Sequence, residues 1–269
     1  MPRAYYARAA GAEYWSEHWG HHSVAELLAV ARRSPLTDLV TAALPRDGCV
    51  LEAGCGLGQY VILLRERGWR AVGIDWSLEA LCEARRVADV PLAASELRAL
   101  AVRRGAVAAV VSLGVVEHDP TGPEPILREA HRVLRPGGRL VVSVPYLNGA
   151  RRVLAPYQAW QNRRLRARGG EFYQFAFTLA EMRRHLEASG FAVESARPYD
   201  PARLPRQTLR ALGLARSPRA RGPGPAVPLN GGSARGLRSR LARVVRRLLY
   251  TRGALALLGH MVLLVAVKR

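Results

Sequence analysis

Three glycines at alternate positions, Gly54, Gly56 and Gly58, closely follow an acidic residue, Glu52, in the stretch VLEAGCGLGQY of residues 50–60. Glycine has no Cβ and adopts positive φ without strain, so such a loop lets the backbone lie close to a bound ligand. A short apolar segment precedes the loop, and an apolar pattern of helical period follows it. The stretch therefore predicts a strand, a tight ligand-binding loop and the start of a helix.

Acidic residues around this loop indicate the charge of its ligand. A dinucleotide-binding loop has the pattern G-x-G-x-x-G, whereas this chain has G-x-G-x-G followed by Gln59. Glu52 beside the loop would repel a pyrophosphate, and Asp75 and Glu96 also lie at or just past the ends of predicted strands. We therefore expect a ligand that carries an ammonium or sulfonium group and a ribose, and not a dinucleotide.

Predicted strands alternate with helices over most of residues 49–197, which indicates an α/β fold with a doubly wound, Rossmann-like sheet. In such a sheet ligands bind outside the carboxyl ends of the parallel strands, where the acids lie. Before the glycine loop, Val24–Leu44 predicts one amphipathic helix that ends at Pro45. The strands are expected at residues 49–51, 71–74, 90–93, 106–116, 139–144, 191–196 and 260–267.

Five motifs together resemble a known family. LEAGCGLGQY, GIDWS, ASELRAL, LGVVEH and EAHRVLRPGGRLVVSVPY are similar to successive motifs of the class I S-adenosylmethionine-dependent methyltransferases, over about residues 49–197. The resemblance implies seven strands, mostly parallel with an antiparallel last strand, and S-adenosylmethionine as the cofactor. It implies that Asp75 accepts hydrogen bonds from the ribose hydroxyls and that Glu96 faces the adenine. The implied cofactor-binding residues are Glu52, Gly54, Cys55, Gly56, Gly58, Asp75, Trp76, Glu96 and Leu113.

Methyl transfer from a sulfonium mainly requires in-line positioning of the acceptor atom, in some cases with a base that removes a proton. His118 is the candidate base because it follows the fourth strand at the ligand end of the sheet; the alternative is a packing role at a helix end. Tyr146 and Asn148 follow the fifth strand and are candidates for lining the acceptor pocket. Cys55 is interpreted as a small loop residue and not as a nucleophile.

The formal net charge of +20 is concentrated in two segments. Residues 151–170 contain six arginines and no acid, and residues 201–252 contain thirteen arginines and no acid. The remainder is close to neutral, so the protein as a whole is not predicted to bind nucleic acid. The first segment could meet an acidic group of the substrate or be a solvated helix face. The helix predicted at Leu237–Tyr250 could lie on an anionic membrane surface or pack on the sheet.

Four regions are predicted along the chain. An N-terminal helical cap (1–48) precedes the methyltransferase core (49–200), which includes a lid-like connection (146–177). A basic insertion rich in proline, glycine and arginine with an amphipathic helix (201–256) precedes a final core strand (257–269). Three scattered cysteines and the lack of a signal-like apolar segment favour a cytoplasmic location. The amphipathic helix adds the alternative of a peripheral position at an anionic membrane. No metal site is expected at His18, His21 and His22, because no further ligand completes a set.

The function that these observations favour is transfer of a methyl group from S-adenosylmethionine to an O, N or C atom of a small molecule or a lipid- or sugar-linked metabolite. Two alternatives remain open from the sequence. One is an RNA methyltransferase that uses the arginine segments as phosphate contacts. The other is a non-catalytic cofactor-binding protein associated with the membrane. The oligomeric state is not predicted.

Overall fold

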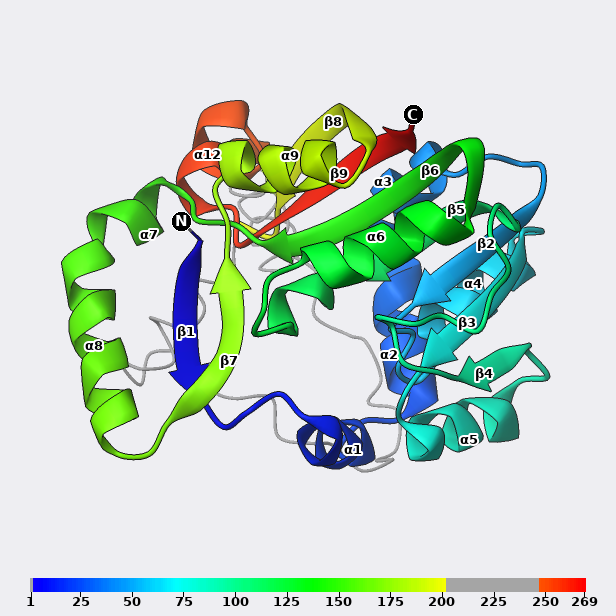
Figure 1. Ribbon diagram of the computed structural model, residues 1–269, viewed down its shortest axis with the longest axis horizontal. Helices are drawn as coiled ribbons and strands as arrows, with labels where there is room; N and C mark the ends of the chain where they lie inside the picture. The colour runs from blue at the N-terminus through cyan, green and yellow to red at the C-terminus, as the bar shows by residue number, and fades with distance from the viewer. Residues whose placement is uncertain (1, 202–246) are drawn as a thin grey trace, which may run out of the picture.

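A seven-stranded β-sheet runs through the molecule in the spatial order β4-β3-β2-β5-β6-β9-β8 (Figure 1). The computed structural model describes residues 2–201 and 247–269. Neighbouring strands from β4 to β6 are parallel, and β9 lies antiparallel between β6 and β8. The predicted fold class is therefore confirmed. The strands are β2 (Cys49–Ala53), β3 (Arg70–Asp75), β4 (Leu92–Ala94), β5 (Val107–Leu113), β6 (Leu134–Pro145), β8 (Phe191–Tyr199) and β9 (Met261–Lys268).

Alternate residues of the central strands supply two hydrophobic cores, one on each face of the sheet. Val50 and Val111 belong to one core, whereas Leu51 and Val110 belong to the other, and all four are fully buried. This follows from the period of two in a strand. It also explains why these strands are continuously apolar. The first core packs on α2 (Val24–Arg33), α3 (Pro35–Ala43), α4 (Gln59–Glu66) and α5 (Leu78–Val87), and the second on α6 (Glu124–Val133) and α9 (Leu179–Ala188).

The single helix predicted at Val24–Leu44 is wrong, because the segment forms two helices. Ser34 is extended (φ −79°, ψ 130°) and separates α2 from α3. Its hydroxyl accepts a hydrogen bond from the backbone N–H of Leu36. Pro35 disfavours helical backbone at the preceding residue and is suited to the first turn of a new helix. The apolar spacing continues across this break, which is why the period alone did not reveal it.

A second, two-stranded sheet lies at the end of the molecule opposite β4 (Figure 1). It pairs β1 (Arg3–Ala7) with β7 (Glu171–Ala176) in antiparallel fashion. The connection before β7 forms α7 (Gly149–Val153) and α8 (Ala155–Ala167), where the sequence predicted one helix at about Gln158–Ala167. The strands of this sheet were not predicted, because each is short and its partner lies at the other end of a long stretch of chain.

The basic segment 201–252 lies almost entirely outside the described residues, and so does most of the helix predicted at Leu237–Tyr250. The chain resumes before α12 (Arg252–Leu258), which contacts α7 and leads into β9. The helices that the structure describes include none long and apolar enough to span a membrane.

Asn148 joins the end of β6 to two neighbouring segments. Its side chain is fully buried, and its Oδ1 accepts a hydrogen bond from the backbone N–H of Arg151 at 2.8 Å. Its Nδ2 donates to the carbonyl of Gly259, just before β9, at 2.7 Å. Asn148 is thus the N-cap of α7 and also ties that helix to the last strand.

Replacement of Asn148 by Ala should lower the free energy of unfolding by about 2 kcal/mol, because a helix cap is lost and a buried carbonyl is left unpaired. Chemical denaturation monitored by circular dichroism measures this change. Asn162→Ala is the matched control, because Asn162 is only partly buried and its side chain donates to the carbonyl of Ala4. Equal losses for the two variants would contradict the anchoring role of Asn148.

Candidate functional site

A cavity of about 810 Å³ opens at the carboxyl ends of β2, β3 and β5. Its wall brings together residues that are far apart in the chain, from the strand ends, from α1 (Ala12–Gly20) and from the β1–β7 sheet. Of the predicted site residues, those on this wall are Glu52, Gly54, Cys55, Asp75, Trp76, Glu96, Leu113 and His118. The edge of the sheet that the sequence indicated is therefore where the large pocket lies.

The glycine loop has left-handed backbone at each of its three glycines, with φ values of +83° at Gly54, +51° at Gly56 and +67° at Gly58. The carboxylate of Asp75 holds this shape, because its Oδ2 accepts a hydrogen bond from the backbone N–H of Gly56 at 2.8 Å. The other oxygen accepts from the N–H of Ser77 at 3.0 Å. Asp75 therefore couples the loop after β2 to the start of α5.

Gly56 and Gly58 do not line the cavity, but their lack of a side chain is required. A Cβ on Gly56 would come within 2.4 Å of the ring of Trp19, and one on Gly58 within 3.2 Å of the Ala84 side chain. Trp19 of α1 thus lies directly against the loop and is itself part of the cavity wall. Any larger residue at position 56 would displace this indole.

Glu52 places a buried carboxyl with a free hydrogen-bonding position beside the glycine loop. The residue is 3% exposed, and its Oε2 has no hydrogen-bond partner among the described residues. Burial raises the pKa of Glu52 well above its usual range, and the nearby Asp75 adds to the effect. Burial also raises the pKa of Asp75, although the N–H groups of Ser77 and Gly56 oppose this. An ammonium donor at this position would satisfy Oε2 and favour the charged carboxylate.

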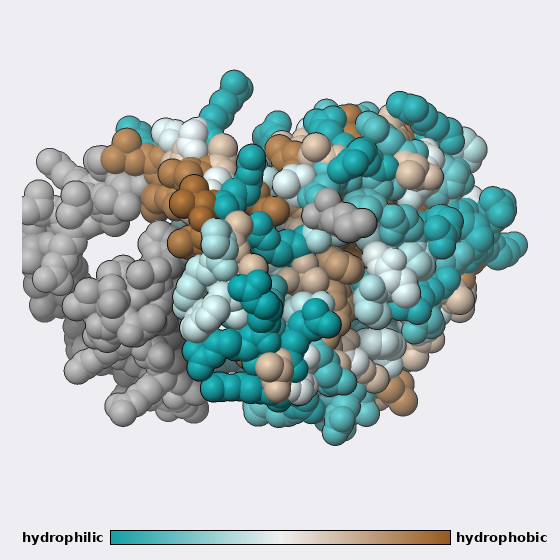
Figure 2. Space-filling view, turned by 60° about the vertical axis from the view of Figure 1, so that its left-hand side comes forward, coloured by the Kyte–Doolittle hydropathy of each residue, from teal (hydrophilic) through white to brown (hydrophobic). Residues whose placement is uncertain are grey.

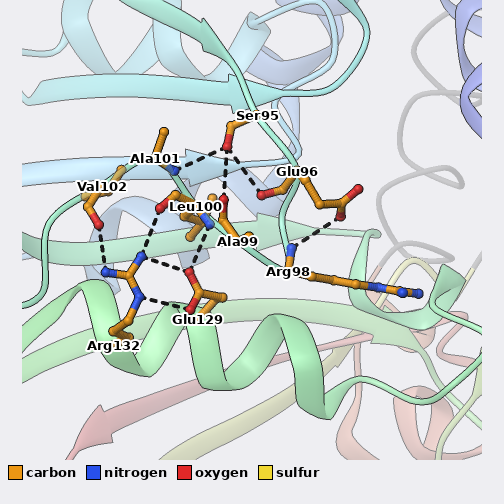
Figure 3. Close-up of polar contacts among 9 residues, drawn as sticks. All are labelled: Ser95, Glu96, Arg98, Ala99, Leu100, Ala101, Val102, Glu129 and Arg132. Atoms are coloured by element: carbon orange, nitrogen blue, oxygen red, sulfur yellow. Dashed lines mark hydrogen bonds and ion pairs between the residues drawn. The ribbon is translucent and has the colours of Figure 1, made fainter.

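The loop that carries Glu96 is fixed to α6 by two side chains, as Figure 3 shows. Glu129 accepts a hydrogen bond from the N–H of Leu100 at 2.9 Å. Arg132 donates to the carbonyls of Leu100 and Val102 at 2.9 and 2.8 Å, and it also pairs with Glu129. Glu96 is exposed on the cavity wall, and its carboxylate accepts a hydrogen bond from the N–H of Arg98 at 3.3 Å.

Arg98 and Asp119 form a bidentate pair at the same wall. Two guanidinium nitrogens donate to the two oxygens of Asp119, each at 2.8 Å, and Asp119 is 5% exposed. The pair connects the loop after β4 to the segment after η1 (Val116–His118). It consumes the positive charge of Arg98, so this arginine is not available as a simple anion site.

His118 faces the cavity with one ring nitrogen already assigned. Its Nδ1 lies 2.8 Å from the carbonyl oxygen of Tyr173, which can only accept, so Nδ1 carries the hydrogen. In the neutral ring Nε2 is then the basic nitrogen. The imidazole packs edge-on against Trp15 and Tyr173, and burial lowers the pKa of His118. The ring is therefore held in one orientation as a neutral base.

Neither of the two residues expected to line the acceptor pocket lies on the cavity wall. Asn148 uses both ends of its side chain in the anchoring bonds described above, so its expected role is corrected to a structural one. Tyr146 forms a bridge with Phe177, which is fully buried. Three aromatic residues that do lie on the wall are Trp15, Phe172 and Tyr199.

These wall residues come from parts of the chain that the sequence did not connect to the site. Trp15 and Trp19 lie four residues apart and stack at 5.9 Å, a helical spacing that could have indicated an aromatic face. Tyr199 is the last residue of β8. The rule that ligands bind at the carboxyl ends of parallel strands did not indicate it, because β8 is an outer strand whose neighbour is antiparallel. Within the described residues no three His, Cys, Asp or Glu side chains are grouped as metal ligands.

Glu117 is a second buried carboxyl close to the site. It is 2% exposed, its Oε2 has no partner among the described residues, and burial raises its pKa to about 8. It precedes His118 in η1 but does not line the cavity. A neutral Glu117 is therefore the form that the folded protein favours at neutral pH.

With the geometry described, comparison with known proteins becomes informative. A family model described as a methyltransferase domain matches residues 25–196, which is more than half of the chain. The chain belongs to this methyltransferase domain family. The match begins at α2 and extends into β8, so it covers the glycine loop and every predicted cofactor-binding residue. The predicted family and its cofactor, S-adenosylmethionine, are thus confirmed.

Individual relatives are more distant. A probable S-adenosylmethionine-dependent methyltransferase of Mycolicibacterium smegmatis is 32% identical over 150 residues, which are 54% of this chain and 52% of that protein. The ubiquinone biosynthesis O-methyltransferase of Cupriavidus pinatubonensis is 30% identical over 164 residues, 56% of this chain and 64% of that protein. The chain spans less than two thirds of the length of either relative.

Solved structures share the fold of this methyltransferase domain. The geranyl diphosphate C-methyltransferase of Streptomyces coelicolor A3(2), determined with Mg²⁺, geranyl diphosphate and S-adenosyl-L-homocysteine, superposes with a TM-score of 0.57 at 17% identity. The superposition covers 87% of this chain and 78% of the other. At this identity the likeness concerns the arrangement of the elements and not the substrate.

The free energy of unfolding should fall as pH rises from 4 to 8, because folding keeps Glu117 protonated over this range. Its folded pKa of about 8 lies above the ordinary value of 4.5, so the folded state binds more protons than the unfolded state between these values. Glu117→Gln should remove this pH-dependent loss. The difference in the free energy of unfolding between Glu117→Gln and wild type should therefore increase by up to about 3 kcal/mol from pH 4 to pH 7. Denaturation across this range measures it, with the exposed Glu187→Gln as control. Parallel curves for wild type and Glu117→Gln would disprove the assignment.

Proposed function

We propose that this methyltransferase domain transfers the methyl group of S-adenosylmethionine to an O, N or C atom of a small molecule or of a lipid- or sugar-linked metabolite. The observation that carries the proposal is one cavity in which the glycine loop, Asp75 and Glu96 share a wall with His118. The first three suit the cofactor, and the last suits an acceptor. A single pocket for both is what direct transfer requires.

The residues on the wall fit the cofactor chemically. Oε2 of Glu52 is a buried acceptor without a partner among the described residues, which suits a cationic amino group. The Asp75 oxygens accept hydrogen bonds from the N–H groups of Gly56 and Ser77 and retain lone pairs for ribose hydroxyls. Glu96 stands at the cavity mouth at the end of a clamped loop and suits the adenine amino group. When bound, the cofactor supplies an electrophilic methyl group.

His118 acts on the acceptor in this proposal. Its Nε2 takes a proton from the acceptor hydroxyl or amine, while the Tyr173 carbonyl holds Nδ1–H and fixes the ring. Trp15, Phe172 and Tyr199 exclude water and present aromatic surface to the acceptor. This lining, together with the sequence similarity to a ubiquinone biosynthesis O-methyltransferase, supports an acceptor with a substantial apolar or aromatic part.

S-adenosylmethionine binding depends on the glycine loop in this proposal, and Gly56→Ala tests it. The new Cβ would collide with Trp19, so we expect affinity to fall at least about tenfold. Asp75→Ala should have a similar effect, because it releases the loop and removes a ribose acceptor. Titration calorimetry measures both.

Gly105→Ala is the control for backbone strain. Gly105 has a φ of +68°, and a Cβ there would meet no atom within 4 Å, so only the left-handed conformation is penalised. Its cofactor affinity should stay at the wild-type value. Unchanged affinity for S-adenosylmethionine in both Gly56→Ala and Asp75→Ala would contradict the assignment of the cofactor site.

Loss of the base should appear in the pH profile of the reaction. The pKa of His118 lies below its ordinary value of 6.5, so wild-type kcat/KM should rise with pH up to that pKa and be level at neutral pH. His118→Gln should remove this rise and lower kcat by about 10²–10⁴-fold.

The acceptor is first found by incubating the protein with labelled cofactor and a cell lysate. His131→Gln, away from the cavity, is the control, and retention of the pH limb in His118→Gln would exclude the base.

A further inference from the structure

The helix α8 is attached to the rest of the molecule along one narrow stripe. Gln158 accepts hydrogen bonds from Arg3 at 2.7 Å and from the Tyr5 hydroxyl at 3.1 Å. Asn162 donates to the carbonyl of Ala4 at 2.7 Å. These contacts connect α8 to β1, and the helix contains no buried residue. Most of its circumference therefore faces outward.

The outward side of α7 and α8 carries large apolar and aromatic residues that nothing in the described structure covers. Val153 is 79% exposed, Leu154 44%, Tyr157 54% and Trp160 44%. Tyr157 and Trp160 lie three residues apart, and their rings stack at 5.8 Å. A helix face of this kind marks an interaction site more often than isolated exposed residues do. We call these four residues the α8 apolar face.

Exposed arginines flank this face without neutralising acids. Arg152, Arg163, Arg164, Arg166 and Arg168 are exposed, and residues 151–170 contain no Asp or Glu. None of these five forms an ion pair with an acid in the described part of the chain. The guanidinium of Arg164 lies 4.7 Å from the centre of the Trp160 ring, which shows how the two features merge. The surface thus combines apolar side chains with uncompensated positive charge.

The apolar surface continues onto α12. A Cβ on Gly149 of α7 would lie 2.8 Å from a methyl group of Leu257, and Leu257 is 50% exposed. Leu248, just before α12, is 62% exposed. Figure 2, which turns the side of α7 and α8 forward, shows hydrophobic surface gathered in one area beside strongly hydrophilic side chains. This juxtaposition is that of an interfacial surface and not of an ordinary solvated helix.

We propose that the α8 apolar face and its flanking arginines dock on an anionic phospholipid surface. Tyr and Trp favour the headgroup level of a bilayer, and arginines attract acidic lipids while their stems lie along apolar surface. The aliphatic residues Val153 and Leu154 favour lipid over RNA, because they offer no plane on which a base could stack. The arrangement corresponds to a surface that lies on a membrane without crossing it.

Docking in this way would bring the cavity near the bilayer. The chain passes from α8 directly into β7, and Glu171 and Phe172 at the start of β7 line the cavity. An acceptor with a lipid tail could then reach the site from the membrane surface. This consequence rests on the proposed function, whereas the docking surface itself does not.

Flotation of the full chain with vesicles tests the proposal. Vesicles of phosphatidylcholine mixed with phosphatidylglycerol should bind the protein, and phosphatidylcholine vesicles should bind it weakly. Val153→Asp with Trp160→Glu should abolish most of the binding. Leu78→Asp with Val87→Glu is the matched control, because both residues are exposed on α5 (60% and 56%), away from this surface, and the net charge changes equally. Equal binding by the α8 double variant and wild type would overturn the proposal.

Two double variants test whether the position of the arginines matters, because both change the net charge by the same amount. Arg163→Glu with Arg164→Glu should lower the partition coefficient roughly 25-fold or more, at about fivefold for each arginine lost. Arg183→Glu with Arg184→Glu on α9 changes the net charge equally and should have little effect. Equal losses of vesicle binding in the two double variants would show that the total charge of the protein alone attracts it to the vesicles, and this would overturn the proposed surface.

Two further measurements distinguish other partners and the proposed function. If the α8 variants lose retention on single-stranded RNA, or lose self-association in sedimentation, while vesicle binding is unchanged, the surface serves that partner and the proposal fails. Calorimetry with S-adenosylmethionine should give the wild-type affinity for every α8 variant. A failure of vesicle binding with intact cofactor binding would therefore leave the methyltransferase assignment standing.

Discussion

The hydrogen bond from the Gly56 backbone N–H to the Asp75 carboxylate is the constraint on which the site depends. It joins the loop after β2 to the last residue of the adjacent parallel strand β3, and the glycines of that loop have left-handed backbone. A carboxylate buried to this degree is costly unless N–H groups surround it, and Gly56 and Ser77 supply them. The same carboxylate then remains able to accept from a ligand, so the group that shapes the loop also faces the cavity.

The aromatic wall around the cavity connects three elements that are remote in sequence. Trp15 and Trp19 come from α1, His118 from η1, and Tyr173 from β7, and their rings contact one another in series. The β1–β7 sheet positions both ends of this series, because β1 precedes α1 and β7 carries Tyr173. The small sheet is therefore more than a connection, since it fixes the orientation of the candidate base.

Acidic and basic residues are separated in space. The cavity wall carries Glu52, Asp75 and Glu96, and Arg98, the one described arginine on that wall, is paired with Asp119. The exposed arginines of residues 151–170 lie on the outer side, away from the cofactor end. The exposed arginines of residues 151–170 are therefore a feature of the outer surface and not of the pocket wall.

The sequence by itself determined the sheet, the glycine loop and the acids at the strand ends, because these depend on local periodicity and on residue types that tolerate little substitution. It placed Asp75 and His118 at the same edge for the same reason. It did not reveal the break at Ser34, since the apolar period continues across it. It also misassigned Asn148, whose distant partner, the carbonyl of Gly259, is known only once β9 is inserted between β6 and β8. Only the tertiary structure decided which aromatic residues line the cavity, because Trp15, Phe172 and Tyr199 meet through pairing between distant segments that no local pattern encodes.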